Sequence, residues 1–187
     1  MSSCKRNNIV SIAITSFNYG QYIGEAVKSV INQTSPNWRL YINDNGSTDN
    51  TYEVLKPYLK DKRISWFVHS ENVGLKNNLK FSVDNMSTKF CSMLQADDFL
   101  EDTFVENALE NFEHYPNTPF VFFNWQQYMD ETKERFFHNR FPFDENYSGI
   151  VNISPYLTVF NFVPMHMAVF KTEALQYAFK FYMESPF

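Results

Sequence analysis

The sequence is poor in cysteine, with only Cys4 and Cys91 among its 187 residues. The two match no metal-ligand spacing and do not make a disulfide framework, so a reducing compartment fits the chain. Also lacking are an apolar signal core near the start, MSSCKRNNIV, and any run of the ~18 apolar residues needed to span a bilayer. We expect a cytoplasmic protein and leave open a peripheral association with the inner face of the membrane.

Basic residues are fewer than acidic ones, 16 against 21, which gives a formal net charge of -5. Domains that neutralise nucleic-acid phosphates are usually basic, so we do not expect nucleic acid as a partner. Apolar residues, in contrast, are abundant: 44% of the chain is hydrophobic and 18% is aromatic. This length and composition predict a single domain over residues 1–187 with a sizeable core.

Apolar strand patterns and amphipathic helix patterns alternate four times along the first part of the chain. We expect strands at 9–15, 38–44, 64–69 and 90–95, and helices at 21–33, 48–60 (disturbed at Pro57), 74–86 and 102–115. Such alternation predicts an α/β fold in which helices flank a mostly parallel sheet.

The pattern changes after YPNTP, residues 115–119. Residues 120–130 and 133–139 predict two strands that form a small antiparallel hairpin, and 140–152 predict a loop. A short helix at 154–162 and a strand at 164–171 follow. The final residues, FYMESPF, carry no helix stop signal, and we expect the sequence to be part of a larger protein.

Polar side chains follow each of the first four predicted strands, in the segments TSFNYGQY, NDNGSTD, HSENVG and QADD. In open α/β sheets, ligands bind beyond the carboxyl ends of the strands, where loops from neighbouring strands converge. We therefore expect one ligand site built from these four strand ends. They supply Thr15, Asn18, Asp44, Asn45, Asp49, Asn72, Asp97 and Asp98.

Asp97 and Asp98 are adjacent carboxylates whose repulsion is costly unless a cation or a donor compensates it. Such oxygen ligands suit Mg²⁺ or Mn²⁺, which keep waters and bridge to phosphates. Alternatively, the pair begins the next helix, where carboxylates favour the positive end of the helix dipole. The residues alone leave both interpretations open.

The segment DNGSTD has a structural role of its own, because Asn45 and Gly46 make a turn and Ser47 or Thr48 can cap the next helix. That role does not explain Asp44, whose carboxylate can accept hydrogen bonds from a donor edge such as the imide of a pyrimidine base. Tyr19, in FNYGQY, is either a core residue or a site residue.

The sequence resembles the family 2 glycosyltransferases in four motifs and in their order. The motifs are VSIAITSFNYGQYIGEAVKSVINQT, DNGSTDNT, ENVGLKNNLK and LQADDFL. These are inverting enzymes of the GT-A fold that use nucleotide-diphosphate sugars. The resemblance covers residues 9 to about 115 and is loose beyond them. It implies transfer of a sugar, from a donor such as a UDP-sugar, to a glycan or lipid-linked acceptor in polysaccharide biosynthesis, with Mn²⁺ or Mg²⁺ as cofactor.

The resemblance also implies roles for individual residues. Residues 1–115 form the nucleotide-sugar half, in which Asp44 meets the base and QADD is the acidic DXD-type motif that holds ribose and metal. Gln95 stands where many members have an acid, which leaves Asp97 and Asp98 as the working pair. The remaining expected nucleotide-binding residues are Thr15, Phe17, Asn18 and Tyr19 after the first strand, and Asn72, Gly74 and Lys76 in a loop that closes over the nucleotide.

Residues 116–187 form the expected acceptor half. The family's catalytic base is an Asp or Glu in a later motif, and no convincing match precedes Phe187. Glu184 lies near the right place but lacks the pattern, so we expect the base beyond the end of this chain. Aromatic and imidazole groups of this half, Trp125, Tyr128, Phe136 and His138, would face the acceptor, whereas His166 fits a core position better than a catalytic one.

Two other functions remain open. A sugar nucleotidyltransferase would share the alternation of strands and helices. It needs, however, a Gly-rich basic loop after the first strand, and TSFNYGQY has no Lys or Arg. A nucleotide-sugar-binding module without turnover remains open because the base motif is missing.

Overall fold

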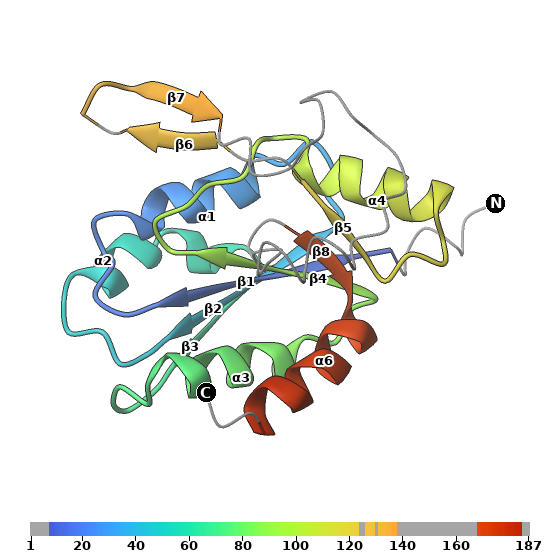
Figure 1. Cartoon of the computed structure of the whole chain (residues 1–187). Coiled ribbons are helices and arrows are strands. Elements are labelled where there is room, and N and C mark those ends of the chain that lie inside the picture. Colours follow the sequence, from blue (N-terminus) through green and yellow to red (C-terminus); the bar gives the residue numbers. More distant parts are fainter. Residues whose placement is uncertain (1–7, 124–125, 130, 138–167, 185–187) are drawn as a thin grey trace.

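The computed structural model describes residues 8–123, 126–129, 131–137 and 168–184. Within them, a six-stranded sheet carries helices on both faces, and a separate two-stranded hairpin stands beside it (Figure 1). The sheet contains β1 (Val10–Ser16), β2 (Trp38–Asp44), β3 (Ile64–Val68), β4 (Phe90–Gln95), β5 (Phe120–Phe122) and β8 (Ala168–Lys171). The hairpin contains β6 (Gln126–Met129) and β7 (Glu134–Phe137), and the helices are α1 (Ile23–Ile31), α2 (Thr51–Leu55), the short 3₁₀ helix η2 (Tyr58–Lys60), α3 (Leu75–Asn85), α4 (Phe104–His114) and α6 (Thr172–Glu184).

The strand order in the sheet is β3-β2-β1-β4-β8-β5. The first four strands are parallel, while β8 runs antiparallel to both β4 and β5. The chain moves outward from β1 to β3 and then returns to the other side of β1 with β4. The order therefore reverses between β1 and β4, and in sheets of this kind the crevice at such a reversal is where ligands bind.

Alternation along the strands divides the core into two layers. Ile12 and Ile14 of β1 are fully buried in the cluster that includes α1 and α4, whereas Ala13 faces the cluster that includes α3 and α6. Figure 1 shows the same division, with α1, α2 and α4 on one face and α3 and α6 on the other. Cys91 belongs to the second cluster, where burial raises the pKa of its thiol to about 11.

The predicted α/β fold is confirmed, and β2 and β4 have the predicted bounds. Pro57 does divide the predicted helix at 48–60, since α2 ends at Leu55 and η2 begins at Tyr58. The helix α6 was not predicted, although Leu175 and Phe179, four residues apart, are both buried by it.

The prediction of one strand over 120–130 is wrong. Residues 120–122 form β5, which pairs with β8 in the main sheet, whereas β6 begins at Gln126 and pairs with β7. The hairpin itself is present, but its first strand is much shorter than predicted. Of the predicted strand at 164–171, the structure describes β8, and the predictions for 140–152 and 154–162 lie outside the described residues. No helix in the described ranges is long and apolar enough to cross a membrane.

Candidate functional site

A cavity of about 610 Å³ opens at the carboxyl ends of β1 and β4, where the strand order reverses. Seven residues predicted for the ligand site line it: Thr15, Phe17, Tyr19, Asn45, Asn72, Gln95 and Asp97. Thr15 and Gln95 are register partners across the two strands. The prediction that several strand ends converge on one site is therefore matched by a cavity of suitable size for a nucleotide.

Aromatic rings stand at the mouth of this cavity. Phe17 is 38% exposed and Tyr19 is 39% exposed, so neither ring is a core residue. The α3 side of the cavity is more apolar than the sequence indicated, because Leu75 and Leu79 lie there, one helical turn apart. Their spacing on α3 was the signal that could have placed them in the site.

Six other predicted residues do not line the cavity: Asn18, Asp44, Asp49, Gly74, Lys76 and Asp98. Asn18 instead joins two loops. Its backbone N–H donates to Ser47 Oγ at 2.9 Å, and its Oδ1 accepts the Thr48 N–H at 2.9 Å. The unusual backbone of Asn18, with φ of 57°, is the conformation that lets both contacts form.

Asp44 is only 2% exposed at the end of β2. Its Oδ1 accepts the backbone N–H of Ser47 at 2.8 Å, so the turn does explain one of its two oxygens, contrary to the interpretation from the sequence. Its backbone carbonyl also accepts the His69 N–H at 2.9 Å, which ties the end of β3 to β2. Asp44 therefore has a structural role whatever it does for a ligand.

The loop after β4 carries the acidic pair. Asp97 is exposed on the cavity wall, Asp98 is half-buried, and the Asp98 N–H donates to the Gln95 carbonyl at 3.2 Å. The alternative that this pair caps the next helix is wrong, because α4 begins at Phe104 with Thr103 at its N-cap. The two carboxylates are thus not explained by the helix dipole.

No group of three or more His, Cys, Asp or Glu side chains converges as a metal site in the described ranges of the chain. Asp97 on the cavity wall, with Asp98 next to it in the chain, nevertheless fits Mg²⁺ or Mn²⁺, because these ions take several of their ligands from water and phosphate. The donor set at Asp97 and Asp98 is compatible with such an ion.

Asp49 joins the β1–α1 loop to the start of α2 by hydrogen bonds. Its Oδ2 accepts the Gly20 N–H at 2.9 Å, and its Oδ1 accepts the Thr51 N–H at 3.1 Å. Burial alone would raise the pKa of Asp49, but hydrogen bonds from the Thr51 side chain and from the Gly20 and Thr51 backbone outweigh burial and lower it. The carboxylate form is the one that holds the loops together.

The hairpin β6–β7 contacts the loop that carries the acidic pair. Arg135 Nη1 lies 2.6 Å from Glu101 Oε1, and the rings of Phe99 and Tyr128 meet edge to face at 5.6 Å. Tyr128, predicted on the acceptor side, therefore lies beside the site. Trp125, His138 and His166 lie outside the described residues, as do the side chains of Phe136 and Glu184, whose backbones belong to β7 and α6.

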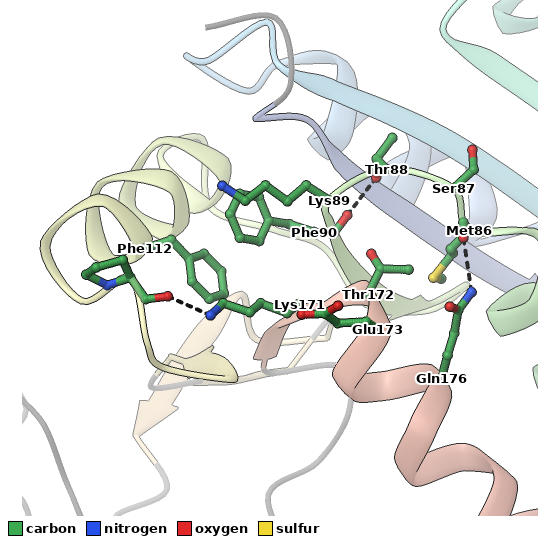
Figure 2. A pocket seen from close by; sticks show the side chains of 11 residues that line it. Met86, Ser87, Thr88, Lys89, Phe90, Phe112, Lys171, Thr172, Glu173 and Gln176 are labelled. Atoms are coloured by element: carbon green, nitrogen blue, oxygen red, sulfur yellow. Dashed lines mark hydrogen bonds between the residues drawn. The ribbon is translucent and has the colours of Figure 1, made fainter. Parts of the chain in front are cut away.

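A second cavity, of about 550 Å³, lies at the opposite ends of the parallel strands, between the start of β4 and the start of α6 (Figure 2). Two lysines line it, but Lys171 Nζ donates to the Pro116 carbonyl at 2.6 Å and Lys89 Nζ to Asn8 Oδ1 at 3.3 Å. Glu173 adds a negative charge there. Both cations already have partners, so this cavity is the poorer candidate for an anionic ligand.

Comparison with solved structures confirms the GT-A glycosyltransferase fold. Residues 1–349 of S. aureus TarS in complex with UDP-GlcNAc match with a TM-score of 0.72 at 13% identity, over 91% of this chain and 47% of that one. The mannosyltransferase PcManGT from Pyrobaculum calidifontis, in complex with GDP-Man and Mn²⁺, matches with a TM-score of 0.62 at 16% identity, over 90% and 46%. At such identities the likeness shows the fold alone.

The model of the family described as Glycosyl transferase family 2 matches residues 11–179, and the chain belongs to this family. Chondroitin synthase from Escherichia coli is 32% identical over 59% of the chain and 16% of that protein. The putative teichuronic acid biosynthesis glycosyltransferase TuaG from Bacillus subtilis (strain 168) is 32% identical over 54% of the chain and 41% of that protein. The matched region thus spans less than half of either relative, and the chain is a glycosyltransferase by family.

Proposed function

We propose that this chain binds a nucleotide-diphosphate sugar, most simply a UDP-sugar, and that its sugar is transferred with inversion to a glycan or lipid-linked acceptor in polysaccharide biosynthesis. The observation that carries the proposal is the cavity at the β1–β4 reversal, which has aromatic rings at its mouth and Asp97 on its wall. Complexes of proteins of the same fold with UDP-GlcNAc and GDP-Man support a nucleotide-sugar as the ligand.

The base of the nucleotide is assigned to the side of the cavity formed by Thr15, Phe17 and Tyr19. An exposed ring can stack on a base. Asp44 Oδ1 is occupied by the Ser47 N–H, so the second carboxylate oxygen is the group we assign to the base. Asn72, Gly74 and Lys76 belong to the β3–α3 connection that we propose closes over the nucleotide.

Asp97 and Asp98 would hold Mn²⁺ or Mg²⁺ next to the diphosphate, with Gln95 beside them. When bound, a divalent cation supplies positive charge that stabilises the negative charge of the departing diphosphate. With the cation bound, the carboxylates would also orient the donor, because the place of the cation decides where the phosphates can lie. The PcManGT complex with Mn²⁺ supports a metal in a protein of this fold.

An inverting transfer also needs a carboxylate that takes the proton of the acceptor hydroxyl as its oxygen attacks the anomeric carbon. We assign this role to Glu184 or to a carboxylate of a longer protein, since the relatives extend well beyond the matched region. Residues 116–187, including the hairpin that touches the acidic loop, form the proposed acceptor side of the same domain.

Calorimetric titration with UDP and with UTP, each with and without Mn²⁺, tests the proposal. A transferase should bind UDP in a metal-dependent manner and without a preference for the triphosphate. A preference for UTP would favour a nucleotidyltransferase. Absence of UDP binding under both conditions would contradict the proposed donor site. Tight UDP binding without turnover of the donor, in a protein long enough to contain the base, would favour a binding module.

A further inference from the structure

Asn45, the first residue after β2, is a buried amide that joins three segments. It is 4% exposed, and its backbone N–H donates to the Ser16 carbonyl at 2.8 Å, which links the ends of β1 and β2. Its side-chain Oδ1 accepts the Val73 N–H at 2.9 Å, and its Nδ2 donates to Asn72 Oδ1 at 2.9 Å. One side chain therefore holds the β3–α3 connection with a donor and an acceptor together.

Asn72 continues the same network. Its Oδ1, besides accepting from Asn45, accepts the Gly74 N–H at 2.9 Å. Gly74 has φ of 81° and is the N-cap of α3, so this contact fixes the point at which the helix begins. The position of the first turn of α3 thus depends on the contact between the two amides.

The backbone of the β2–α2 loop also packs closely against the β3–α3 connection. A Cβ on Gly46 would lie 2.9 Å from the Glu71 carbonyl carbon and 3.3 Å from the Asn72 backbone nitrogen, so only glycine lets the β2–α2 loop approach these two residues so closely. Asn45, Asn72 and Leu75 all form part of the cavity wall. A shift of this connection would therefore change the shape of the cavity without changing the sheet.

We propose that Asn45 is a positioning residue for the nucleotide: it holds the Asn72–Leu75 wall in the place where the ligand needs it. The inference rests on the proposed function. If only a fraction of molecules has the wall in place, the apparent Kd rises by the reciprocal of that fraction. Asn45 lines the cavity too, but Val73 and Asn72 already engage its side-chain Oδ1 and Nδ2, so we assign its effect to the position of the wall rather than to a contact with the ligand.

Asn45→Ala removes both side-chain contacts. We expect the Kd for UDP with Mn²⁺ to rise about tenfold while the protein remains folded. Asn111→Ala is the matched control, because it also removes an amide bond, from Nδ2 to the Asn107 carbonyl at 2.8 Å, but on α4 and away from the cavity. It should leave the Kd unchanged.

Asn45→Asp is the conservative variant. Its carboxylate can still accept the Val73 N–H but cannot donate to Asn72 Oδ1. We expect its Kd to lie between those of wild type and Asn45→Ala.

A double-mutant cycle separates positioning from direct binding. If Asn45 acts through Asn72, the variant with both Asn45→Ala and Asn72→Ala should bind UDP about as well as the weaker single variant. Effects that multiply would overturn the proposal, because they would mean two independent contacts with the ligand.

Hydrogen exchange without nucleotide tests the positioning separately from the proposed function. In Asn45→Ala the Val73 and Gly74 amides should exchange faster, while amides in the middle of β1 stay protected. Unchanged exchange at residues 73 and 74 would overturn the inference. Faster exchange in a protein whose wild type binds no UDP would instead contradict the proposed function alone.

Discussion

Thr15 at the end of β1 and Gln95 at the end of β4 are register partners, and both line the same cavity. They are 80 positions apart in the sequence, counted from 15 to 95, and only the reversal of strand order between β1 and β4 brings them together. We expect the bound nucleotide to span this pair, with its base on the Thr15 side and its diphosphate on the Gln95 side.

Replacement of the acidic pair should remove the metal dependence of nucleotide binding. In Asp98→Ala we expect the affinity for UDP with Mn²⁺ to fall to the value without metal, and in Asp97→Ala to fall part of the way. Calorimetry with and without Mn²⁺ measures both. Asp84→Ala, which removes an exposed carboxylate that pairs with Lys80 on α3, is the control. Equal Mn²⁺ dependence in all three variants would exclude a metal at Asp97 and Asp98.

Asp44 should prove to have two roles that a pair of variants can separate. Asp44→Ala leaves the Ser47 N–H without its acceptor, so it should lower both Tm and UDP affinity. Asp44→Asn keeps the Oδ1 acceptor and should preserve Tm, while loss of a charged hydrogen bond to the base costs about 1.5 to 3 kcal/mol, roughly tenfold to a hundredfold in Kd. If the asparagine variant binds UDP normally, Asp44 is a turn residue only.

Gly20→Ala should destabilise the protein, because the added Cβ would lie 2.9 Å from the Thr51 backbone nitrogen and 3.0 Å from Asp49 Oδ2. Overpacking of this kind costs about 1 to 3 kcal/mol in the free energy of unfolding. Gly24→Ala is the control, since its Cβ would meet only Val54 Cγ1 at 3.2 Å and alanine favours the helix. Urea unfolding compares the two, and equal stability would show that the Gly20 loop moves freely aside.

The hydrogen bonds to Asp49 should make stability depend on pH in the acidic range. Its folded pKa is lowered below the ordinary value of 3.8, so the stabilisation is fully present above that value and is lost as the pH falls through the lower folded pKa. Asp49→Asn cannot titrate there. The difference in unfolding free energy between wild type and Asp49→Asn should therefore shrink on acidification, and a difference that is constant with pH would contradict this role.

The alternation of strands and helices up to α4 could be predicted because hydrophobic periodicity is a local signal. Residues 120–130 were misread for the same reason. The run FVFFNWQQYM gives no local sign that β5 belongs to the main sheet and β6 to the hairpin. That division is set by pairing with β8, which begins 46 positions after Phe122, counted from 122 to 168.

The site was predictable to the extent that strand ends indicate it. Asp97 and Thr15 follow or end predicted strands, and both line the cavity. The contact of Asn45 with Asn72 joins side chains 27 residues apart and depends on the orientation of two amides, which no sequence pattern specifies. The second role of Asp44, as the acceptor for the Ser47 N–H, is a local contact. It was missed because the sequence around it indicates a turn but does not show that Asp44 takes part in it.

Paramagnetic line broadening by Mn²⁺ tests most directly whether a nucleotide and its metal bind at the β1–β4 crevice. Amide resonances are followed while Mn²⁺ is added at low concentration, first without UDP and then with it. We predict that UDP concentrates the broadening on residues 95–98, with weaker effects at 15–19 and 72–75. Broadening centred instead on Lys89 and Glu173 at the opposite cavity, or scattered over surface carboxylates and unaffected by UDP, would contradict the proposed site.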